Sequence, residues 1–219
     1  MYKINYSGNP RGKIITICGL DLVGKSTQAK LLAKNLGAVY MKFPSEDTAI
    51  GTMIRAILNN APVSINTNNR TSNVEWMDRD PRTFQALNFA DKINKQSKIE
   101  EILLSNTNII MDRYDIDALV YGIVDGCGKE WTNELNKLLI PSDIAIYFDG
   151  PQYKREQEKD LYEDNEEFML NIKSNFDTLF KNSKYNNTKL VTFNTRNEPK
   201  EKVSERLLGM VEYLLMEKP

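Results

Sequence analysis

The sequence contains no histidine, and only two of its 219 residues are cysteines. The absence of histidine excludes Ser–His and Cys–His nucleophilic mechanisms, and it excludes metal sites with histidine ligands. Cys18 and Cys127 cannot form a disulfide framework, and they indicate a reducing compartment. The chain also has no apolar run of membrane-spanning length, and its first residues do not form a signal-peptide pattern. We therefore expect a cytoplasmic protein that does not act on a membrane.

Neither sign of charge is in excess, because 29 Lys and Arg residues stand against 30 Asp and Glu residues. A chain with a formal net charge of −1 has no overall attraction for nucleic acid, so we expect no nucleic-acid partner. With 41% hydrophobic and 27% charged residues, the composition is that of an ordinary globular protein. The length favours one domain, which we place at residues 13–219 after a flexible lead-in of residues 1–12.

A glycine-rich segment between an apolar run and a helical pattern is the strongest signal in the chain. It has the spacing G-x-x-x-x-G-K-S of a phosphate-binding P-loop, and it follows the apolar residues 14–18. The glycines let backbone N–H groups face phosphate oxygens, the lysine reaches the outer phosphates, and the serine hydroxyl suits Mg²⁺. The alternative is a chance glycine-rich turn, which the flanking strand and helix argue against. The residues expected to bind ATP are Gly19, Leu20, Asp21, Val23, Gly24, Lys25, Ser26 and Thr27.

Strand-like and helix-like segments alternate along the chain. Strands are predicted at residues 14–18, 38–43, 107–111, 143–148 and 189–193, with helical patterns between them. This alternation predicts an α/β fold of three layers, the P-loop NTPase architecture, with a central five-stranded parallel sheet and helices on both faces. A long helix is expected from Pro81 to about Ser105, and residues 59–79 are expected to form a long loop. Side chains that directly follow the strands should converge at the carboxyl edge of the sheet, where ligands bind.

Asp112 and Arg113 follow one of these strands and form a candidate phosphoryl-transfer pair. The carboxylate would hold Mg²⁺ through water together with Ser26, and the guanidinium would bind a phosphate with two parallel hydrogen bonds. The alternative is a surface ion pair at the end of a strand. The presence of the P-loop favours the active site.

A charged segment at about residues 151–163 follows the fourth predicted strand and is a candidate for a short lid. A lid would bring a cation onto the transferring phosphate, and the candidates are Lys154, Arg155 and Lys159. The alternative is a solvated face, which is the more common role of a run of charges.

Phe84, Asn88 and Lys92 recur at every fourth position of the long predicted helix, so they share one face. An aromatic ring, an amide and a cation in one line can bind the base and phosphate of a second nucleotide. The alternative is that Phe84 belongs to the core and Lys92 is a solvated helix charge, and composition alone favours that alternative.

Three motifs in this order resemble those of thymidylate kinases. They are residues 15–21 with 24–28, then Phe43-Pro44 followed by Ile50-Gly51, and then Asp112-Arg113-Tyr114 followed by Tyr121. The resemblance, which covers residues 13–180, implies a nucleoside-monophosphate kinase fold, transfer of the ATP γ-phosphate to dTMP with Mg²⁺, and a homodimer.

The resemblance also implies roles for individual residues. Asp21 would contact the sugar 3′-hydroxyl and the P-loop, and Arg113 would hold the acceptor phosphate. Phe43, Pro44 and Leu58 would form one wall of the acceptor pocket, and Tyr121 would crowd the 2′ position and favour deoxyribose. With Lys25 and Arg155, Asp21 and Arg113 form the expected catalytic set.

The chain departs from the family pattern at several of these positions. Glu46 stands where the family commonly has an arginine, Lys92 replaces an arginine that grips the acceptor phosphate, and Asn88 replaces a base-stacking phenylalanine. Asp117 replaces a serine or threonine near the base, where it would either read an exocyclic amine or cap a helix. Leu22 stands where some members have an arginine, and in members without it the lid supplies the cation.

Two other functions remain compatible with the residues. A deoxynucleoside kinase would phosphorylate a 5′-hydroxyl and would need a carboxylate base, for which Glu46 is the candidate. An ATP-dependent switch would hydrolyse ATP without an acceptor.

Overall fold

The computed structural model describes residues 11–59, 61, 63–67, 70–74, 80–152 and 165–217. The strands are β1 (Ile14–Cys18), β2 (Val39–Lys42), β3 (Val63–Thr67), β4 (Arg70–Val74), β5 (Ile109–Asp112), β6 (Ile144–Asp149), β7 (Lys184–Tyr185) and β8 (Thr188–Asn194). The helices are α1 (Lys25–Leu36), α2 (Ala49–Leu58), α3 (Pro81–Asn94), α4 (Gln96–Leu104), α5 (Asp115–Val124), α6 (Lys129–Asn136), α7 (Glu166–Leu179) and α8 (Lys200–Met216). None of the helices within these ranges is long and apolar enough to cross a membrane.

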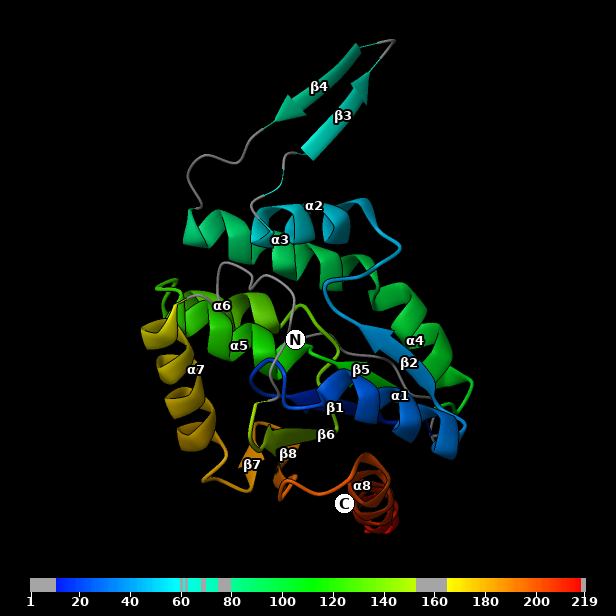
Figure 1. Ribbon diagram of the computed structural model, residues 1–219. Helices are drawn as coiled ribbons and strands as arrows, with labels where there is room; N and C mark the ends of the chain where they lie inside the picture. Colours follow the sequence, from blue (N-terminus) through cyan, green and yellow to red (C-terminus); the bar gives the residue numbers. More distant parts are fainter. Residues whose placement is uncertain are drawn as a thin grey trace.

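The main sheet has the strand order β2-β5-β1-β6-β8-β7 (Figure 1). The five predicted strands pair in parallel, and the short strand β7 adds an antiparallel edge that the sequence patterns did not predict. Strand β1 is fully buried between β5 and β6. Since every residue of β1 is enclosed on both faces, its run of aliphatic side chains is continuous rather than alternating.

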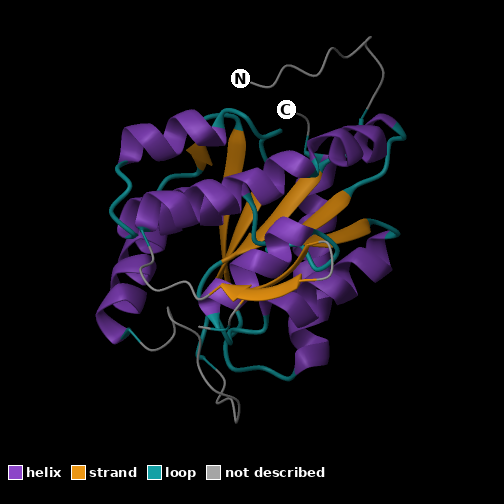
Figure 2. Cartoon of the chain, turned by 90° about the horizontal axis from the view of Figure 1, so that it is seen from above, coloured by secondary structure: helices purple, strands orange, loops and turns teal. Residues whose placement is uncertain are grey.

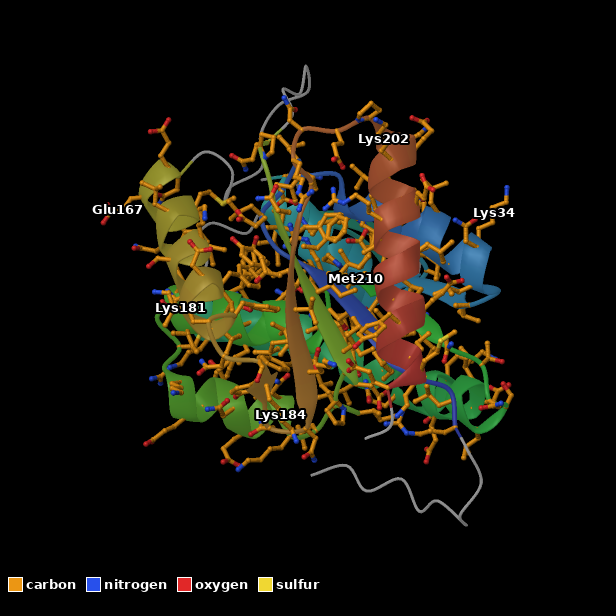
Figure 3. The ribbon with its side chains drawn as sticks, turned by 90° about the horizontal axis from the view of Figure 1, so that it is seen from below. Lys34, Glu167, Lys181, Lys184, Lys202 and Met210 are labelled. Atoms are coloured by element: carbon orange, nitrogen blue, oxygen red, sulfur yellow. The ribbon has the colours of Figure 1, made fainter. Side chains whose placement is uncertain are left out.

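Helices cover both faces of this sheet (Figure 2). On one face, α1 and α8 pack against β1 and β6 through a cluster that includes Leu32, Ile146 and Leu207. On the other face, α5 and α7 pack through a cluster that includes Val120 and Ile172. Figure 3 shows α7, which carries Glu167, and α8, which carries Lys202 and Met210, on opposite sides of the strands. The expected three-layer architecture is confirmed.

Two predicted segments differ from the structure. Residues expected to form a long loop include an antiparallel hairpin, β3 and β4, which extends from the end of the molecule where α2 and α3 lie (Figure 1). The predicted helix over residues 81–105 is divided at Lys95 into α3 and α4. The buried side chain of Gln96 donates to the carbonyl of Lys92 at 2.8 Å, and that carbonyl is the normal i−4 partner of the Gln96 backbone N–H. The same carbonyl also accepts a hydrogen bond from the Lys95 backbone at 3.2 Å, so both local contacts lie at the division, where periodicity does not reveal them.

Helices α2 and α3 each begin at a side-chain cap. The Thr48 side chain accepts a hydrogen bond from the backbone of Gly51 at the start of α2. The Asp80 side chain accepts one from Thr83 at the start of α3, and Pro81 occupies the first turn as predicted. Each cap satisfies a backbone donor that the helix itself leaves unpaired, and so fixes where the helix begins.

Candidate active site

The P-loop connects β1 to α1 in the strand–loop–helix arrangement that the motif predicts. Gly19 and Gly24 have φ values of 128° and 87°, a region that favours glycine, and a Cβ on Gly19 would lie 2.9 Å from the carbonyl oxygen of Phe148. The Lys25 side chain is only 4% exposed, and its ammonium group donates a hydrogen bond to the Leu20 carbonyl. Burial and the nearby charge of Arg113 lower the pKa of Lys25 below its ordinary value. The loop therefore holds an ammonium group at the point where a helix begins.

Strand β5 places Asp112 and Arg113 beside this loop. Asp112 is in register with Ile17 of β1, and the Arg113 backbone N–H donates to the Ile17 carbonyl at 3.1 Å. The Asp112 side chain is 1% exposed, and it accepts a hydrogen bond from the Tyr40 hydroxyl at 3.0 Å. The predicted convergence of strand ends is thus present at β1 and β5.

The Arg113 guanidinium bridges two carboxylates. It donates to Asp21 in the P-loop, and it lies 3.7 Å from Asp117 at the start of α5. The ring centroid of Tyr121 lies 5.2 Å from the guanidinium carbon, which is within cation–π range. Burial acts to lower the pKa of Arg113, but the charges of Asp21 and Asp117 raise it well above its ordinary value. Arg113 is therefore a permanent cation held in one orientation.

A cavity of about 330 Å³ opens beside Arg113, between the P-loop and the helices α2, α3 and α5. All ten residues that the sequence predicts to bind the acceptor line this cavity. They are Asp21, Phe43, Pro44, Leu58, Phe84, Asn88, Lys92, Arg113, Asp117 and Tyr121. The fold therefore brings together predicted residues from five separate segments of the chain.

Helix α3 contributes a buried lysine, Lys92, to the lining of this cavity. Lys92 is 5% exposed, donates to the Asn88 carbonyl at 3.1 Å, and lies 5.4 Å from the ring centre of Phe43. Burial lowers the pKa of Lys92 to about 8, with the charge of Arg113 acting in the same direction. The alternative of a solvated helix charge is therefore wrong for Lys92, whereas Phe84 both lines the cavity and belongs to the core.

Asp117 is engaged within the protein and caps α5. One carboxylate oxygen accepts a hydrogen bond from the Tyr114 backbone at 3.3 Å, and the other lies 3.5 Å from the Gly19 backbone nitrogen and 3.7 Å from Arg113. Burial raises the pKa of Asp117 to about 6. Of the two roles considered from the sequence, this geometry favours the helix cap over the reading of an exocyclic amine.

The wall that contains Phe43 and Pro44 is fixed by a buried carboxylate on α3. Asp91 is fully buried, and it accepts hydrogen bonds from the Ser45 backbone and the Thr48 hydroxyl, each at 2.7 Å. Sequence reasoning did not identify Asp91, because nothing in a helical pattern distinguishes this carboxylate from a solvated one. The cavity lining also includes residues that the sequence did not predict, namely Lys42, Arg55, Asn59, Gln85 and Ala118.

A second cavity, of about 360 Å³, borders the P-loop at Val23, Gly24 and Thr27. Its other lining residues come from helix α1, from helix α8 and from the segment between β8 and α8. They are Gln28, Thr195, Glu198, Pro199, Lys200 and Val203. The acceptor-side cavity borders the P-loop at Asp21, so these two cavities contact different residues of the loop. The sequence patterns did not predict this cavity, although residues 195–199 directly follow a predicted parallel strand and so lie at the edge where ligands bind.

The structure describes the predicted metal ligands but not the predicted lid cations. Ser26 begins α1 and Asp112 ends β5, so both lie at the carboxyl edge of the sheet. The lid candidates Lys154, Arg155 and Lys159 lie outside the described residues. Gln152, which precedes them, donates to the Asp21 carbonyl at 3.0 Å.

Comparison with known proteins finds relatives that match most of the chain. A model of the thymidylate kinase family matches residues 17–207. Thymidylate kinase of Arabidopsis thaliana is 33% identical over 148 residues, which are 65% of this chain and 51% of that protein. A probable thymidylate kinase of Methanococcus maripaludis is 28% identical over 210 residues, 91% of this chain and 94% of that protein. The chain thus spans about half the length of the plant relative and almost all of the archaeal one.

Solved structures show the same fold. The structure of thymidylate kinase from Candida albicans superposes with a TM-score of 0.71 at 23% identity, covering 93% of this chain and 92% of that one. The structure of thymidylate kinase from Ehrlichia chaffeensis superposes with a TM-score of 0.68 at 20% identity, covering 92% of this chain and all of that one.

Proposed function

The chain belongs to the thymidylate kinase family, and from that premise we propose that it transfers the γ-phosphate of ATP to a deoxynucleoside monophosphate, chiefly dTMP, to give dTDP. The observation that carries the proposal is the cavity beside Arg113, which joins the P-loop through Asp21. A cavity of this kind provides for a second nucleotide opposite the one that the P-loop holds.

The proposed roles follow from the charges around this junction. Lys25 would leave the Leu20 carbonyl and neutralise the outer phosphates of ATP, while Arg113 would hold the acceptor phosphate. Asp21 would orient Arg113 and contact the sugar 3′-hydroxyl, and Tyr121 would crowd the 2′ position. The acceptor phosphate is already a nucleophile, so positioning and charge neutralisation suffice, and no histidine is needed.

The second cavity fits the donor. We assign it to the base and sugar of ATP, because it borders the same loop at Val23 and Gly24 while the acceptor cavity borders it at Asp21. Within the described residues, the buried Oγ1 of Thr195 and Oε1 of Gln28 have no hydrogen-bond partner. Both residues line this cavity, so a bound base or ribose would offer them partners.

Mg²⁺ is proposed as the cofactor. The Ser26 hydroxyl and the Asp112 carboxylate are oxygen ligands of the type that Mg²⁺ prefers, and the hydrogen bond from Tyr40 fixes the carboxylate. When bound, the ion would neutralise charge on the transferring phosphates. Retained turnover after exhaustive chelation with EDTA would contradict this assignment.

The two alternatives receive less support. Glu46, the candidate base of a deoxynucleoside kinase, is 68% exposed and is paired with Lys42 and Arg55 at 3.7 Å and 4.0 Å. A paired and exposed carboxylate is a poor general base. An ATP-dependent switch would hydrolyse ATP without an acceptor, so that function does not account for the acceptor cavity.

One experiment separates these functions. ATP consumption is measured with dTMP, dUMP, dCMP, dGMP, thymidine or no acceptor, and kcat/KM is compared. We expect dTMP to give the highest value and the reaction without acceptor to be negligible. Phosphorylation of thymidine in preference to dTMP would favour the nucleoside kinase, and rapid turnover without acceptor would favour the switch.

The resemblance also implies a homodimer, which we retain as a proposal. Sedimentation equilibrium at micromolar protein concentration should give twice the mass of one chain, and the mass of a single chain would contradict it.

A further inference from the structure

A carboxylate lies between two cations at the acceptor cavity. The same oxygen of Glu46 is 3.7 Å from the Lys42 ammonium nitrogen and 4.0 Å from a guanidinium nitrogen of Arg55. Lys42 and Arg55 both line the cavity, whereas Glu46 is not among the lining residues. Lys42 and Arg55 therefore border the space for the ligand, and the Glu46 carboxylate contacts both of them from a position outside the cavity lining.

Arg55 is anchored as a positioned donor. Its guanidinium donates to the Pro44 carbonyl at 3.1 Å and to the Ser45 carbonyl. These bonds tie α2 to the wall of the cavity, and they hold the planar group at the wall. A guanidinium has five N–H donors, so the two carbonyl bonds leave donors for a further acceptor.

Lys42 is placed beside the residues that handle phosphate. It is the last residue of β2, and its backbone is in register with Asp112 of β5, the residue before Arg113. Lys42 thus stands at the same sheet edge as the Asp112-Arg113 pair and the P-loop.

The other charged side chains of the cavity have partners elsewhere in the chain. Asp21 and Asp117 are both engaged with Arg113, and Lys92 donates to a backbone carbonyl. Lys42 and Arg55 are engaged with Glu46, whose side chain is 68% exposed. Ion pairs of such exposed groups contribute little free energy, so Glu46 is readily displaced by an acceptor of higher charge.

We propose that Lys42 and Arg55 form a second phosphate-recognition pair of the acceptor site, and that Glu46 occupies their shared position until the monophosphate arrives. This inference rests on the proposed function. A phosphate monoester carries up to two negative charges on three oxygens, so it competes well with a single carboxylate for the same pair of cations. Glu46 would then act as a competitor of the acceptor phosphate, and Arg55 would supply a cation to the wall of the acceptor site.

The sharpest test removes the competitor. For Glu46→Gln we expect the Kd of dTMP, measured by calorimetry, to fall by about two- to fivefold, because an exposed ion pair is lost from the free protein only. The Kd of thymidine, which lacks the phosphate, should not change. Glu101→Gln is the matched control, because Glu101 is an exposed carboxylate paired with Lys98 on α4 and does not line the cavity.

Removal of the cations should have the opposite effect. For Arg55→Ala we expect the Kd of dTMP to rise by about tenfold or more, and for Lys42→Ala by less, with the Kd of thymidine unchanged in both. The double variant Glu46→Arg with Arg55→Ala should recover part of the dTMP affinity, because it returns a cation to the wall.

These outcomes separate this inference from the proposed function. Unchanged or weaker dTMP binding by Glu46→Gln would overturn the displacement by phosphate. Equal losses of dTMP and thymidine binding in Arg55→Ala would show that Arg55 only supports the wall. Failure of the wild-type protein to phosphorylate dTMP would contradict the proposed function itself, and calorimetry does not depend on that reaction.

Discussion

The guanidinium of Arg113 donates a hydrogen bond to the carboxylate of Asp21, although 92 positions separate the two residues in the chain. Asp21 belongs to the loop that would hold the phosphate donor, and Arg113 lines the cavity that would hold the acceptor. The pair therefore connects the two nucleotide sites directly. Four predictions test this arrangement and the residues around it.

Asp21→Asn keeps the shape of the side chain and removes its charge. We expect kcat/KM for dTMP to fall by about 10- to 100-fold, because the charge-assisted bond that orients Arg113 is lost. Steady-state kinetics at saturating ATP measure the effect. Asp47→Asn is the control, because Asp47 is an exposed carboxylate paired with Lys95 away from the cavity lining. A similar loss in both variants would refute the specific role of Asp21.

Lys25→Ala removes the cation of the P-loop. We expect kcat to fall by at least about 100-fold, because a preorganised charge on the transferring phosphate is lost. The thermal midpoint should not decrease, since burial already lowers the pKa of Lys25 and its charged form is costly to the folded state. Wild-type turnover in this variant would show that the loop does not act as proposed.

Acceptor binding should weaken in alkaline solution. Burial lowers the pKa of Lys92 to about 8, so its ammonium group loses its proton as the pH rises from 7 to 9, while a phosphate monoester keeps its charge in this range. We expect the Kd of dTMP to rise by up to about tenfold over this interval. Lys92→Arg should abolish most of the dependence, because arginine stays charged. The same slope in both proteins would assign the dependence to another group.

The lid prediction rests on the sequence, since Arg155 lies outside the described residues. Arg155→Ala is expected to lower kcat more than it raises KM, because a lid cation acts mainly on the transition state. Lys154→Ala is the neighbouring control. If only Lys154→Ala lowers kcat, the role belongs to Lys154.

The sequence by itself determined the phosphate chemistry and the architecture. The spacing of Gly19, Gly24, Lys25 and Ser26 requires a strand before the loop and a helix after it, and the structure has both. These features are local, so they can be read from a few neighbouring residues. The convergence of Asp21 and Arg113 was also predictable, because parallel strands place their carboxyl ends at one edge.

Only the tertiary structure decided which charged side chains are buried and which partners they contact. Lys92 and Asp91 are adjacent charges on a helical pattern, yet both are buried, with different partners on the wall and on α3. The side chain of Gln96 bonds to the Lys92 carbonyl where the long predicted helix is divided, and periodicity shows neither feature. The pairing of Glu46 with Lys42 and Arg55 likewise depends on how β2 and α2 pack. The pKa, orientation and solvent exposure of each side chain depend on its burial and its partners, which exist only in the packed chain. The sequence alone gives only the type of each side chain and its spacing from the others.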